Sequence, residues 1–464
     1  MNVLELFNKL NIYEKCSINY EISNITKDTR KLNRNSLFFL FDKKYLKEAI
    51  LKNVAVIITD LEIECSKTTI IKVNNLQKCY SDALKLFYLI YRPFIIGITG
   101  TCGKTTTTTL VYRTLKLANK NTLLISSNGI NSYYLGKETE YPTSNTTPNL
   151  EVIYSYISMF NYDYIIIEVS SQGISHGRIA GIEFDLGVFL NISQDHLDYH
   201  LTFSNYLNTK RKFFDQINKS GVALINNNSK YKTYFITPNI TNYTFGFLDS
   251  DYNIEVLEVQ LETMKIKIEG KCITTAFTGL HNAENISAVY AITKILNVNV
   301  KYLIMVLQQH YEIDGRFNVI NYKTNKIIVD FAHTEKEFEV VLKHLYENKI
   351  NKLYVVAGCG GNRDKDKRPV LGYLCSKYCD YSIITEDNSR TEDVHDIIND
   401  IKSGFINENF VVIIDRFDAI KYGISLLLEY DILAILGMGK DKSYLINDEY
   451  YSDKMLVNKV LEEV

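Results

Sequence analysis

A glycine-rich segment at residues 97–105, with the sequence GITGTCGKT, carries the strongest chemical signal in the chain. Its glycines let backbone N–H groups turn towards phosphate oxygens, and the helix expected after it adds positive potential at its N-terminus. Lys104 can reach terminal phosphates, and the Thr105 hydroxyl can hold Mg²⁺. Ile98 stands where the general phosphate-loop pattern has Gly, so the match is imperfect. We expect ATP or GTP binding here; the alternative is a glycine-rich turn with a chance Lys-Thr pair.

An acidic residue, Glu168, ends an apolar run that includes three consecutive isoleucines. An acid at the carboxyl end of a buried strand is a usual place for a metal contact beside bound phosphates. The alternative is a carboxylate that caps the next helix. We therefore expect Glu168 to provide a second contact to Mg²⁺.

Two histidines and two aspartates lie close together in residues 191–200. Zinc prefers a closed set of three or four N or S ligands, and no cysteine lies near this segment. A single histidine, His196, that contacts Mg²⁺ beside the phosphates fits the segment better. We expect His200 to be structural.

The composition limits the class of protein that can carry this chemistry. Hydrophobic residues make up 46% of the 464 residues and charged residues 23%, which is ordinary globular usage and excludes wholesale disorder. The 52 Lys and Arg nearly balance the 54 Asp and Glu, which disfavours a generally basic nucleic-acid binder. No run approaches the ~20 apolar residues of a membrane span. The eight cysteines are scattered, without a CxxC pair. We expect a soluble, cytoplasmic monomer that acts on small molecules, without nucleic-acid or membrane partners.

The positions of the apolar runs divide the chain into three regions. Residues 1–92 mix short apolar runs with helical stretches, as in a small α/β domain. In residues 93–312, nearly continuous apolar runs alternate with helical segments, which indicates a parallel sheet buried on both faces. Residues 313–464 repeat this alternation, which predicts a Rossmann-like domain. The apolar runs of the two larger regions are 122–126, 163–170, 184–192, 221–227, 326–333, 352–358, 381–385, 410–414 and 431–436, and a helix is expected over Asp418–Tyr430.

Taken together, the motifs resemble those of the Mur ligase family, the ATP-dependent amide-forming ligases of peptidoglycan precursor synthesis. The loop GTCGKT resembles the family's own phosphate-loop variant, in which Gly at position 98 is not expected. The resemblance is strongest to the members that add the third residue of the stem peptide, and it covers nearly the whole chain in order. The matching segments are 28–30 (DTR), 145–148 (NTTP), 168–172 (EVSSQ), 177–178 (GR), 191–200, 209–210 (TK), 213–214 (FF), 279–282 (GLHN) with Asn285, 315–316 (GR), 330–334 (DFAHT), 358–364 (GCGGNRD), 367–369 (KRP) and 387–390 (DNSR).

This resemblance implies a fold and a reaction. The fold is α/β with three domains: a small N-terminal domain, a central P-loop ATPase-like domain with a parallel sheet, and a C-terminal Rossmann-like domain. The reaction begins when a carboxylate attacks the γ-phosphorus of ATP and forms an acyl phosphate. An amine then attacks the activated carbonyl and phosphate leaves. Negative charge grows in both steps, and Lys104 and Mg²⁺ are suited to stabilise it.

The resemblance also implies a role for each matched residue. Lys104, Lys210, His196 and Glu168 are the implied catalytic residues, and Lys210 resembles the family's carbamylated lysine. The residues implied for ATP are Gly100, Thr101, Gly103, Lys104, Thr105, Thr106, Asn282, Arg316, Asp330 and His333. Those implied for Mg²⁺ are Thr105, Glu168, His196 and the carbamate of Lys210. Those implied for the UDP-MurNAc-dipeptide are Asn145, Thr146, Thr147, Ser170, His176 and Arg178. Those implied for the incoming amino acid are Arg363, Asp387, Asn388, Arg390, Gly437 and Asp441.

The choice of amino acid depends on the far end of its side chain. Diaminopimelate carries a second amino-acid head there, and Arg390 offers a bidentate fork for the carboxylate of that head. Asp441 stands where the family has a glutamate for the distal ammonium. Relatives that add lysine usually lack the arginine at position 390, so diaminopimelate is the expected substrate. The alternative is that Arg390 pairs with Glu392 or Asp393 on the surface.

The sequence departs from the family pattern at residues that are expected to bind the uridine nucleotide, the dipeptide and the amino acid. After Phe41 the chain is about ten residues shorter than its relatives, in a region that helps hold the uridine nucleotide. His176 replaces a common glutamine, and Ser389 replaces a proline that would have fixed φ. The leading interpretation is therefore accompanied by a second one, a divergent paralogue that joins an amino acid to a carboxylate without UDP. A nucleotide-binding protein that has lost ligation, and a folate polyglutamate ligase, are more remote alternatives.

Overall fold

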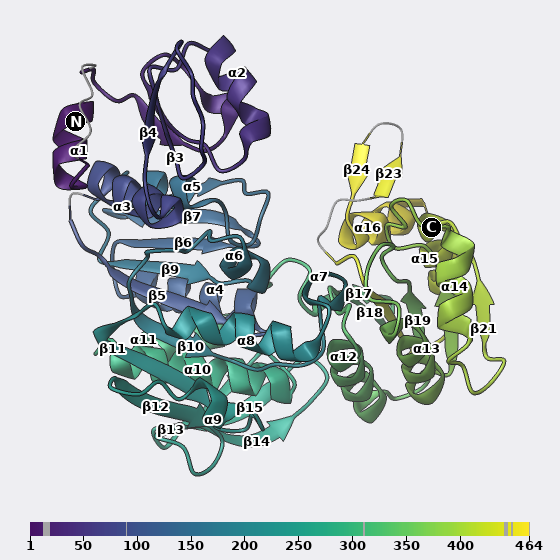
Figure 1. Ribbon diagram of the computed structural model, residues 1–464. Helices are drawn as coiled ribbons and strands as arrows, with labels where there is room; N and C mark the ends of the chain where they lie inside the picture. Colours follow the sequence, from purple (N-terminus) through teal and green to yellow (C-terminus); the bar gives the residue numbers. More distant parts are fainter. Residues whose placement is uncertain (13–18, 90, 310, 440–443, 447–448, 464) are drawn as a thin grey trace.

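A computed structural model of the protein describes residues 1–12, 19–89, 91–309, 311–439, 444–446 and 449–463. Three larger sheets follow one another along the chain, one in each of the three predicted regions (Figure 1). The predicted α/β fold class with three domains is confirmed. The domain boundaries at residues 92 and 312 remain predictions.

The N-terminal sheet has four parallel strands in the order β1-β2-β3-β4. Alternate side chains face opposite sides, as strand geometry requires. Leu37 and Phe39 pack in a core with α1 and α3, whereas Phe38 packs in a second core with Ala49 of α2. The elements of this region are α1 (Val3–Lys9), β1 (Asn24–Thr26), η1 (Thr29–Lys31), β2 (Ser36–Phe39), η2 (Lys43–Tyr45), α2 (Leu46–Leu51), β3 (Val56–Thr59), β4 (Thr69–Lys72) and α3 (Leu76–Tyr88).

The central sheet has nine strands in the order β13-β12-β11-β10-β5-β9-β6-β7-β8. The seven strands from β13 to β6 are mutually parallel, and β7 and β8 continue the sheet as antiparallel strands. The strands are β5 (Phe94–Thr99), β6 (Thr122–Ser126), β7 (Gly129–Tyr134), β8 (Lys137–Tyr141), β9 (Tyr164–Glu168), β10 (Phe184–Phe189), β11 (Ile217–Asn226), β12 (Thr241–Gly246) and β13 (Tyr252–Asn253).

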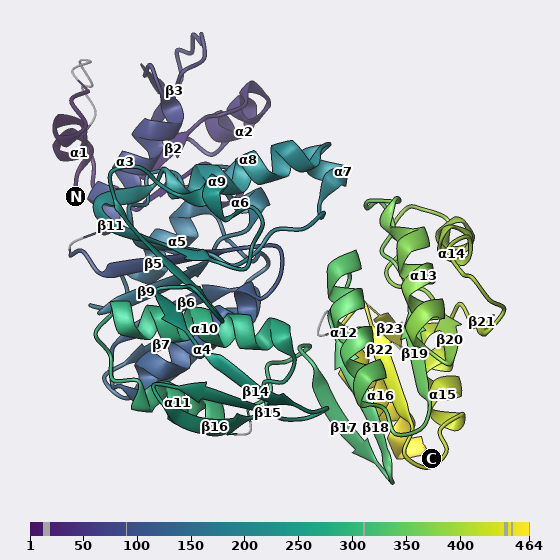
Figure 2. The ribbon, with the colours of Figure 1, turned by 90° about the horizontal axis from the view of Figure 1, so that it is seen from below.

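Helices cover both faces of the central sheet, which explains its nearly continuous apolar runs. One face packs against α5 and α8, and the other packs against α4, α10 and α11 (Figures 1 and 2). The helices are α4 (Lys104–Leu117), α5 (Leu150–Ile157), α6 (Ser171–Ser175), α7 (Leu197–His200), α8 (Phe203–Phe214), α9 (Lys232–Phe235), α10 (Leu280–Ile295) and α11 (Lys301–Gln308), and a small antiparallel sheet follows β13 with strands β14 (Glu255–Val259), β15 (Met264–Ile268) and β16 (Lys271–Thr275).

The C-terminal sheet has six strands in the order β17-β18-β22-β19-β20-β21, parallel except for β17 at the edge. Helices α12, α13 and α14 cover one face, and α15 and α16 cover the other. The elements are β17 (Asn318–Tyr322), β18 (Asn325–Asp330), α12 (Glu335–Asn348), β19 (Leu353–Ala357), α13 (Lys367–Tyr378), β20 (Tyr381–Ile384), α14 (Val394–Lys402), β21 (Phe410–Val412), α15 (Arg416–Ser425), β22 (Ile432–Leu436), β23 (Tyr444–Ile446), β24 (Glu449–Tyr451) and α16 (Asp453–Glu463).

Every apolar run predicted in the two larger regions overlaps a strand, but the helix predicted over Asp418–Tyr430 has other bounds. It begins at Arg416, where the Asp415 side chain caps it, and it ends at Ser425. Beyond it, the carboxylate of Asp431 accepts hydrogen bonds from the backbone N–H groups of Leu428 and Lys352, which turns the chain into β22. Among the described residues, no helix is both long enough and apolar enough to span a bilayer.

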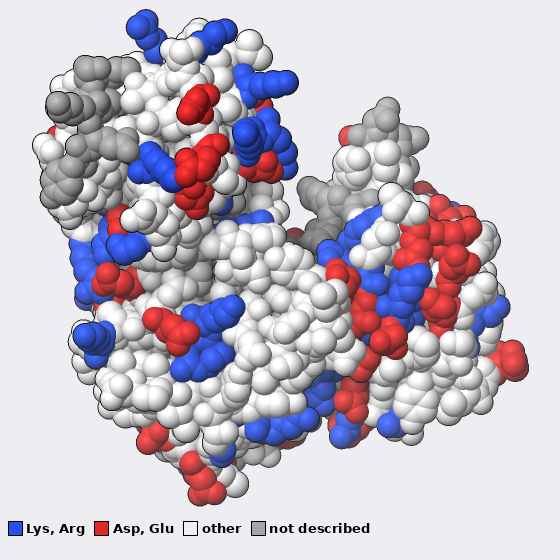
Figure 3. Space-filling model, viewed as in Figure 1, with Lys and Arg blue, Asp and Glu red and all other residues white. Residues whose placement is uncertain are grey.

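The central and C-terminal parts meet at a few polar contacts. Lys326 pairs with Glu262 at 2.6 Å, and the His344 ring lies 3.3 Å from the carbonyl oxygen of Leu261, where β17 and β18 approach the small sheet (Figure 2). The space-filling view shows a hollow between the N-terminal and C-terminal parts (Figure 3). The phosphate loop and the loops at the carboxyl ends of β9 and β10 lie in the central part.

Candidate active site

The phosphate loop connects β5 to α4, as the sequence predicts. Gly103 precedes the helix with φ of 80°, in the left-handed region, and a Cβ atom there would lie 2.2 Å from Oδ1 of Asn285. Glycine is therefore required at this position. The Lys104 ammonium folds back over the loop and donates to the carbonyl oxygens of Gly100 at 3.0 Å and Thr101 at 2.7 Å.

Hydrogen bonds to the segment that follows β10 fix the conformation of the phosphate loop. The Cys102 N–H donates to the Asn191 side chain at 2.9 Å, and the Thr101 N–H donates to the Asn191 carbonyl at 3.0 Å. The Thr101 hydroxyl lies 3.0 Å from the Tyr206 hydroxyl. These bonds fix the loop without using the N–H groups of Gly103, Lys104 or Thr105, which begin the helix. These N–H groups, at the positive end of α4, lie at the predicted phosphate site.

Thr105 and Glu168 come together at the carboxyl ends of β5 and β9. The Thr105 hydroxyl donates to the Glu168 carboxylate at 3.1 Å, and it lies 2.9 Å from the Ser127 hydroxyl. The Ser127 N–H donates to the same carboxylate at 2.9 Å. The three side chains form a group of hard oxygen donors of the kind that Mg²⁺ prefers. Among the described residues, no group of three or more His, Cys, Asp or Glu side chains forms a metal site by itself.

Lys210 is almost completely buried, although it lies on α8 next to charged neighbours. Its ammonium donates to the Gly100 carbonyl at 2.7 Å and lies 4.7 Å from the centre of the Tyr206 ring. Burial, and then the charge of Lys104, lower the pKa of Lys210 well below its ordinary value. Lys210 is therefore not a solvated lysine on the outer face of the helix.

His196 stands before α7 with φ of 53°, an uncommon conformation for a residue other than glycine. Its Nε2 lies 3.3 Å from the Asp195 carboxylate. Burial lowers the pKa of His196 to about 4, even though Asp195 opposes the shift. The ring is therefore neutral at pH 7 and retains a nitrogen lone pair. His200 is buried, and its Nε2 has no hydrogen-bond partner among the described residues, consistent with a structural residue.

The C-terminal residues predicted for ATP lie around the end of β18 and the start of α12. The Asp330 carboxylate accepts hydrogen bonds from the N–H groups of Phe317 and Ala332, both at 2.7 Å. Burial raises the pKa of Asp330 to about 6 against the charge of Arg316, which itself lies over the Phe331 ring. The His333 Nδ1 lies 3.0 Å from the Phe331 carbonyl.

Glu337, which no sequence motif had indicated as a site residue, connects these residues to the phosphate loop. Its carboxylate accepts hydrogen bonds from the N–H groups of His333 and Thr334 at 3.2 and 3.3 Å, and its interaction with Cys102 of the phosphate loop contributes to lowering its pKa. Burial opposes ionisation, but the charges of His333 and Arg316 lower the pKa of Glu337 to about 2. In the sequence, Thr334 and Glu337 have the spacing of a capping box, which indicates a helix start and nothing about the loop.

Asn282 and Thr106 lie at the two helices behind the loop. The Asn282 side chain donates to the Thr278 carbonyl at 2.9 Å and accepts from Asn285 at 3.2 Å. Thr106 is buried in the first turn of α4. Asn285 therefore links the predicted ATP residue Asn282 to Gly103 of the loop.

The residues predicted for the carboxylate substrate form a second group beside Glu168. The Thr147 hydroxyl donates to the Glu168 carbonyl at 2.8 Å and lies 3.1 Å from the Ser170 hydroxyl, and the Thr147 carbonyl accepts from Arg178 at 3.0 Å. The His176 ring packs edge-on against Tyr199, and burial, followed by the charge of Arg178, lowers its pKa. Thr146 is half-buried and Asn145 is exposed on the preceding loop.

Two of the residues predicted for the amino acid line a cavity of about 350 Å³. Asn388 and Arg390 contribute to its wall, together with Glu386, Ser389, Arg416 and Tyr444. The Arg390 guanidinium donates to the Gly361 carbonyl at 2.6 Å. Glu392, which the sequence offered as a surface partner of Arg390, pairs with Arg368 and Lys365, both at 2.8 Å.

The other amino-acid residues lie around this cavity or across from it. A Cβ atom on Gly437 would lie 2.6 Å from the Asp387 carboxylate, whose pKa burial raises. Arg363 reaches the central part and pairs with Asp198 at 3.2 Å. Asp441 lies outside the described residues.

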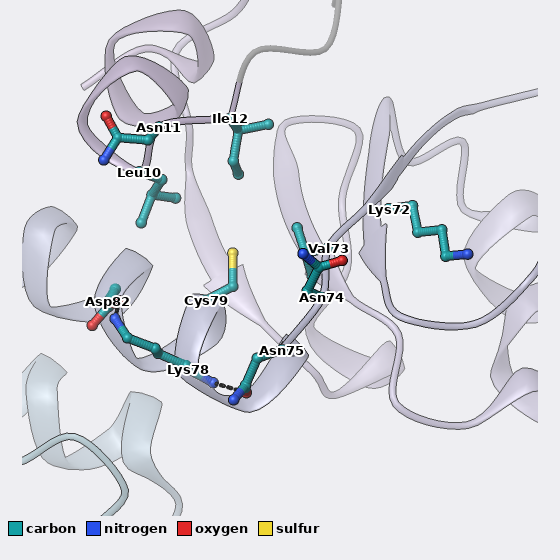
Figure 4. Close-up of a pocket in the computed structure, with 10 residues that line it drawn as sticks. All are labelled: Leu10, Asn11, Ile12, Lys72, Val73, Asn74, Asn75, Lys78, Cys79 and Asp82. Carbon is teal, nitrogen blue, oxygen red and sulfur yellow. Dashed lines mark hydrogen bonds and ion pairs between the residues drawn. The ribbon is translucent and has the colours of Figure 1, made fainter.

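Another cavity, of about 370 Å³, lies between the end of α1, the end of β4 and the start of α3 (Figure 4). Its two lysines have acidic partners, since Lys78 pairs with Asp82 and Lys72 pairs with Glu62. Burial raises the pKa of the Cys79 thiol to about 11, so the thiol is protonated at pH 7. This cavity contains none of the predicted site residues.

Comparison with known proteins identifies the family. Residues 98–293 match the model of the Mur ligase middle domain, and residues 315–440 match that of the Mur ligase glutamate ligase domain. The UDP-N-acetylmuramoyl-L-alanyl-D-glutamate--2,6-diaminopimelate ligase 1 of Clostridium acetobutylicum is 30% identical, over 96% of this chain and 96% of its own. The UDP-N-acetylmuramoyl-L-alanyl-D-glutamate--2,6-diaminopimelate ligase of Phocaeicola vulgatus is 32% identical, over 95% of each chain.

Solved structures show the same fold. A UDP-N-acetylmuramoyl-L-alanyl-D-glutamate--2,6-diaminopimelate ligase superposes with a TM-score of 0.66 at 24% identity, and 98% of each chain is covered. The MurF ligase of Thermotoga maritima superposes with a TM-score of 0.65 at 16% identity, over 95% of this chain and 96% of its own. The chain therefore belongs to the Mur ligase family and is an ATP-dependent, ADP-forming ligase.

Proposed function

We propose that the protein joins an amino group of meso-diaminopimelate to the glutamate carboxylate of UDP-N-acetylmuramoyl-L-alanyl-D-glutamate. Several of its relatives with about 30% identity over nearly the full chain carry this activity in their names. The single observation that carries the choice of amino acid is the position of Arg390. Arg390 lines a cavity of about 350 Å³, and its guanidinium could bind a carboxylate at the far end of a substrate there.

In this mechanism, an oxygen of the acceptor carboxylate attacks the γ-phosphorus of ATP, and the bond to the β-γ bridging oxygen breaks. The acyl phosphate and ADP result. The amine then attacks the acyl carbon, loses a proton, and displaces inorganic phosphate. The Lys104 ammonium, which contacts the Gly100 carbonyl of the loop, neutralises charge on the phosphoryl oxygens. The backbone N–H groups at the start of α4 donate hydrogen bonds to the same oxygens.

Thr105, Glu168 and His196 would hold Mg²⁺ beside the phosphates. The donor set fits this ion, because Thr105 and Glu168 present oxygens within 3.1 Å of each other and the His196 ring is neutral at pH 7. When bound, Mg²⁺ neutralises the developing charge on the transferred phosphoryl group. The protein itself contributes by holding the Thr105 and Glu168 oxygens in position for the ion.

Lys210 has the properties that a carbamylated lysine requires. A carbamate forms when a neutral amine attacks CO₂ and releases a proton, and a lowered pKa makes the neutral amine available. The product would carry a carboxylate where Lys210 now donates to the Gly100 carbonyl. That carboxylate would serve as a further oxygen ligand for a metal ion.

A specific observation favours a second candidate function, the ligation of an amino acid to an acceptor without UDP. Asp42 caps the short helix η2, which leads directly into α2, so no longer loop lies between Phe41 and α2. The same region contains Lys27, whose ammonium lies 5.4 Å from the Phe41 ring centre. This region, which is expected to bind the uridine nucleotide, therefore departs from the family pattern.

An amino-acid-dependent phosphate-release assay tests the proposal. The acceptor is UDP-N-acetylmuramoyl-L-alanyl-D-glutamate, and the panel contains meso-diaminopimelate, L-lysine, L-ornithine and D-alanine. We expect release to be fastest with meso-diaminopimelate. Faster turnover of L-lysine would refute the choice of amino acid, and no turnover with any amino acid would favour the acceptor without UDP.

A further inference from the structure

Glu151 is a buried carboxylate where the N-terminal part of the protein meets the central part. It lies in the first turn of α5, and its side chain is 5% exposed. The Lys31 ammonium pairs with its Oε1 at 2.8 Å, and the buried Tyr80 hydroxyl donates to its Oε2 at 3.0 Å. One carboxylate of the central part therefore accepts a hydrogen bond from η1 and another from α3, two elements of the N-terminal part.

Helix α3 packs closely on the central part around this contact (Figure 1). Ala83 and Leu84 of α3 belong to the same apolar core as Ile153 of α5. A Cβ atom on Gly181, in the turn before β10, would lie 2.0 Å from the Ser81 hydroxyl of α3. Apolar packing is non-directional, whereas hydrogen bonds to a charged group have a defined geometry. The bonds of the buried carboxylate on α5 therefore set the position of α3 along this interface.

The contact lies beside residues implied for the acceptor. The Lys27 ammonium lies 5.8 Å from the centre of the Tyr80 ring and 5.4 Å from that of Phe41. Burial lowers the pKa of Lys27, the charge of Glu151 opposes this shift, and the charge of Arg178 adds to it. Lys27 of the N-terminal part and Arg178 of the central part are therefore close enough to act on each other, and Glu151 supplies negative charge between the two parts.

We propose that Glu151 is a positioning residue for the acceptor. It fixes the N-terminal part, which is expected to bind the uridine nucleotide, relative to the residues of the central part that are implied for the dipeptide. Two of these, Thr147 and Arg178, are bonded to each other, and Thr147 precedes Glu151 by four positions. This inference rests on the proposed function, because it requires an acceptor that contacts both parts. Such a ligand binds less tightly when the spacing of the parts is not fixed, since binding must then order them.

The alternative is that Glu151 only stabilises the fold, and a second ion pair across the same interface provides the matched control. Lys85 of α3 pairs with Glu183 at 2.8 Å, and the two side chains are 38% and 54% exposed. Glu183 immediately precedes β10, at the amino edge of the parallel sheet. Thr147 contacts the Glu168 carbonyl at the carboxyl end of β9, on the opposite edge. Glu183→Gln therefore removes the same charge from the same interface, away from the acceptor residues.

The measured quantity is the Kd of UDP-N-acetylmuramoyl-L-alanyl-D-glutamate, obtained by isothermal titration calorimetry with the whole chain. Glu151→Gln should raise this Kd by about threefold to tenfold, with the KM for ATP unchanged. The acceptor is an anion, so the loss of a negative charge would by itself strengthen its binding. Weaker binding therefore reports a change of position rather than of charge. Glu183→Gln should not weaken binding.

Variants of Lys31 test the same contact from the N-terminal side, and they decide the matter if Glu151→Gln does not fold. Lys31 is 48% exposed, so its replacement should leave the fold intact. Lys31→Met should raise the Kd as Glu151→Gln does, whereas Lys31→Arg, which keeps a charged donor, should preserve affinity. The double variant Lys31→Met, Glu151→Gln should bind no more weakly than either single variant, because residues in direct contact act together.

The outcomes separate this inference from the proposed function. If Glu151→Gln and Lys31→Met lower the melting temperature but leave the Kd unchanged, Glu151 only stabilises the fold; the inference is overturned and the proposed function stands. Additive effects in the double variant would also overturn it, because the two residues would then act separately. If the unmodified protein neither binds nor turns over this acceptor, the proposed function fails and the inference fails with it. Weaker acceptor binding with unchanged ATP kinetics, absent from Glu183→Gln, supports the assignment.

Discussion

Lys104 and Lys210 donate hydrogen bonds to the same backbone oxygen, that of Gly100, at 3.0 and 2.7 Å. Two ammonium groups that share one acceptor repel each other strongly where water is excluded. Lys210 is the more buried of the two, so burial and the charge of Lys104 act together and lower its pKa. Lys104 therefore helps to keep the Lys210 amine neutral.

The first prediction concerns Lys210. The Lys210→Ala variant should lose at least about a hundredfold of phosphate release, because an activating group beside the metal disappears. Formate or acetate at high concentration should restore part of the activity by replacing the carboxylate of a carbamate. Lys212→Ala, which changes an exposed residue on the same helix, is the control. Full activity of Lys210→Ala at ordinary Mg²⁺ concentrations would refute the role.

The second prediction concerns Lys104. Lys104→Ala should reduce kcat by roughly 10²–10³-fold, the usual effect of deleting a group that stabilises transition-state charge. The circular dichroism spectrum should be unchanged, because Lys104 is bonded only to carbonyl groups of its own loop among the described residues. Lys120→Ala, beyond the far end of α4, serves as the control. Near-normal turnover of Lys104→Ala would contradict the assignment of the loop.

The sequence predicted the elements that carry the site better than the contacts between them. Apolar runs located the strands because both faces of the central sheet are buried. The loop was recognisable because local geometry requires Gly103 and because Lys104 and Thr105 follow it at the spacing of a phosphate loop. Glu337 was not recognisable, because its approach to Cys102 depends on how the C-terminal part packs on the central part. Lys210 likewise has exposed charged neighbours in sequence, and only packing buries it.

The third prediction concerns the pH dependence of stability. Ionised Glu337 has a pKa of about 2, below the ordinary 4.5, so it stabilises the fold above pH 4.5 and this contribution is lost as the pH falls towards 2. At roughly 1.4 kcal/mol for each unit, Glu337→Gln should lower the free energy of unfolding at pH 7 by up to ~3 kcal/mol. Urea titrations of both proteins between pH 7 and 4 should show the difference shrink below pH 4.5. Glu347→Gln, exposed on the same helix, should change stability little. A difference independent of pH would show that charge is not the cause.

The fourth prediction concerns Arg390 in the amino-acid cavity. Arg390→Ala should raise the KM for meso-diaminopimelate by about tenfold to a hundredfold, because a charged hydrogen bond to the distal carboxylate is lost. The KM for ATP should stay the same, since Arg390 is not among the residues implied for ATP and lines the amino-acid cavity. Arg390→Lys should recover only part of the loss, because an ammonium cannot bind a carboxylate with a planar fork. Equal increases in both KM values would indicate a general structural defect.

The last prediction compares two ion pairs that join the same two helices, α15 and α16. Arg416 and Asp453 are 1% and 0% exposed and pair at 2.7 Å, whereas Lys421 and Glu463 are 49% and 42% exposed and pair at 2.9 Å. Asp453 also accepts the N–H of Gly439 at 2.9 Å. Asp453→Asn leaves the buried guanidinium without its counter-charge, which should cost roughly 3–5 kcal/mol of unfolding free energy.

Glu463→Gln breaks the exposed pair and should cost about 0–1 kcal/mol, since water already solvates both groups. Urea denaturation of the two variants measures the contrast directly. Arg416 also lines the amino-acid cavity and holds the Glu386 carbonyl, so Asp453→Asn should weaken meso-diaminopimelate binding as well as the fold. Similar stability losses in the two variants would show that burial does not govern the strength of these pairs. A large loss of stability with unchanged amino-acid KM would show that Arg416 keeps its position in the cavity wall without Asp453.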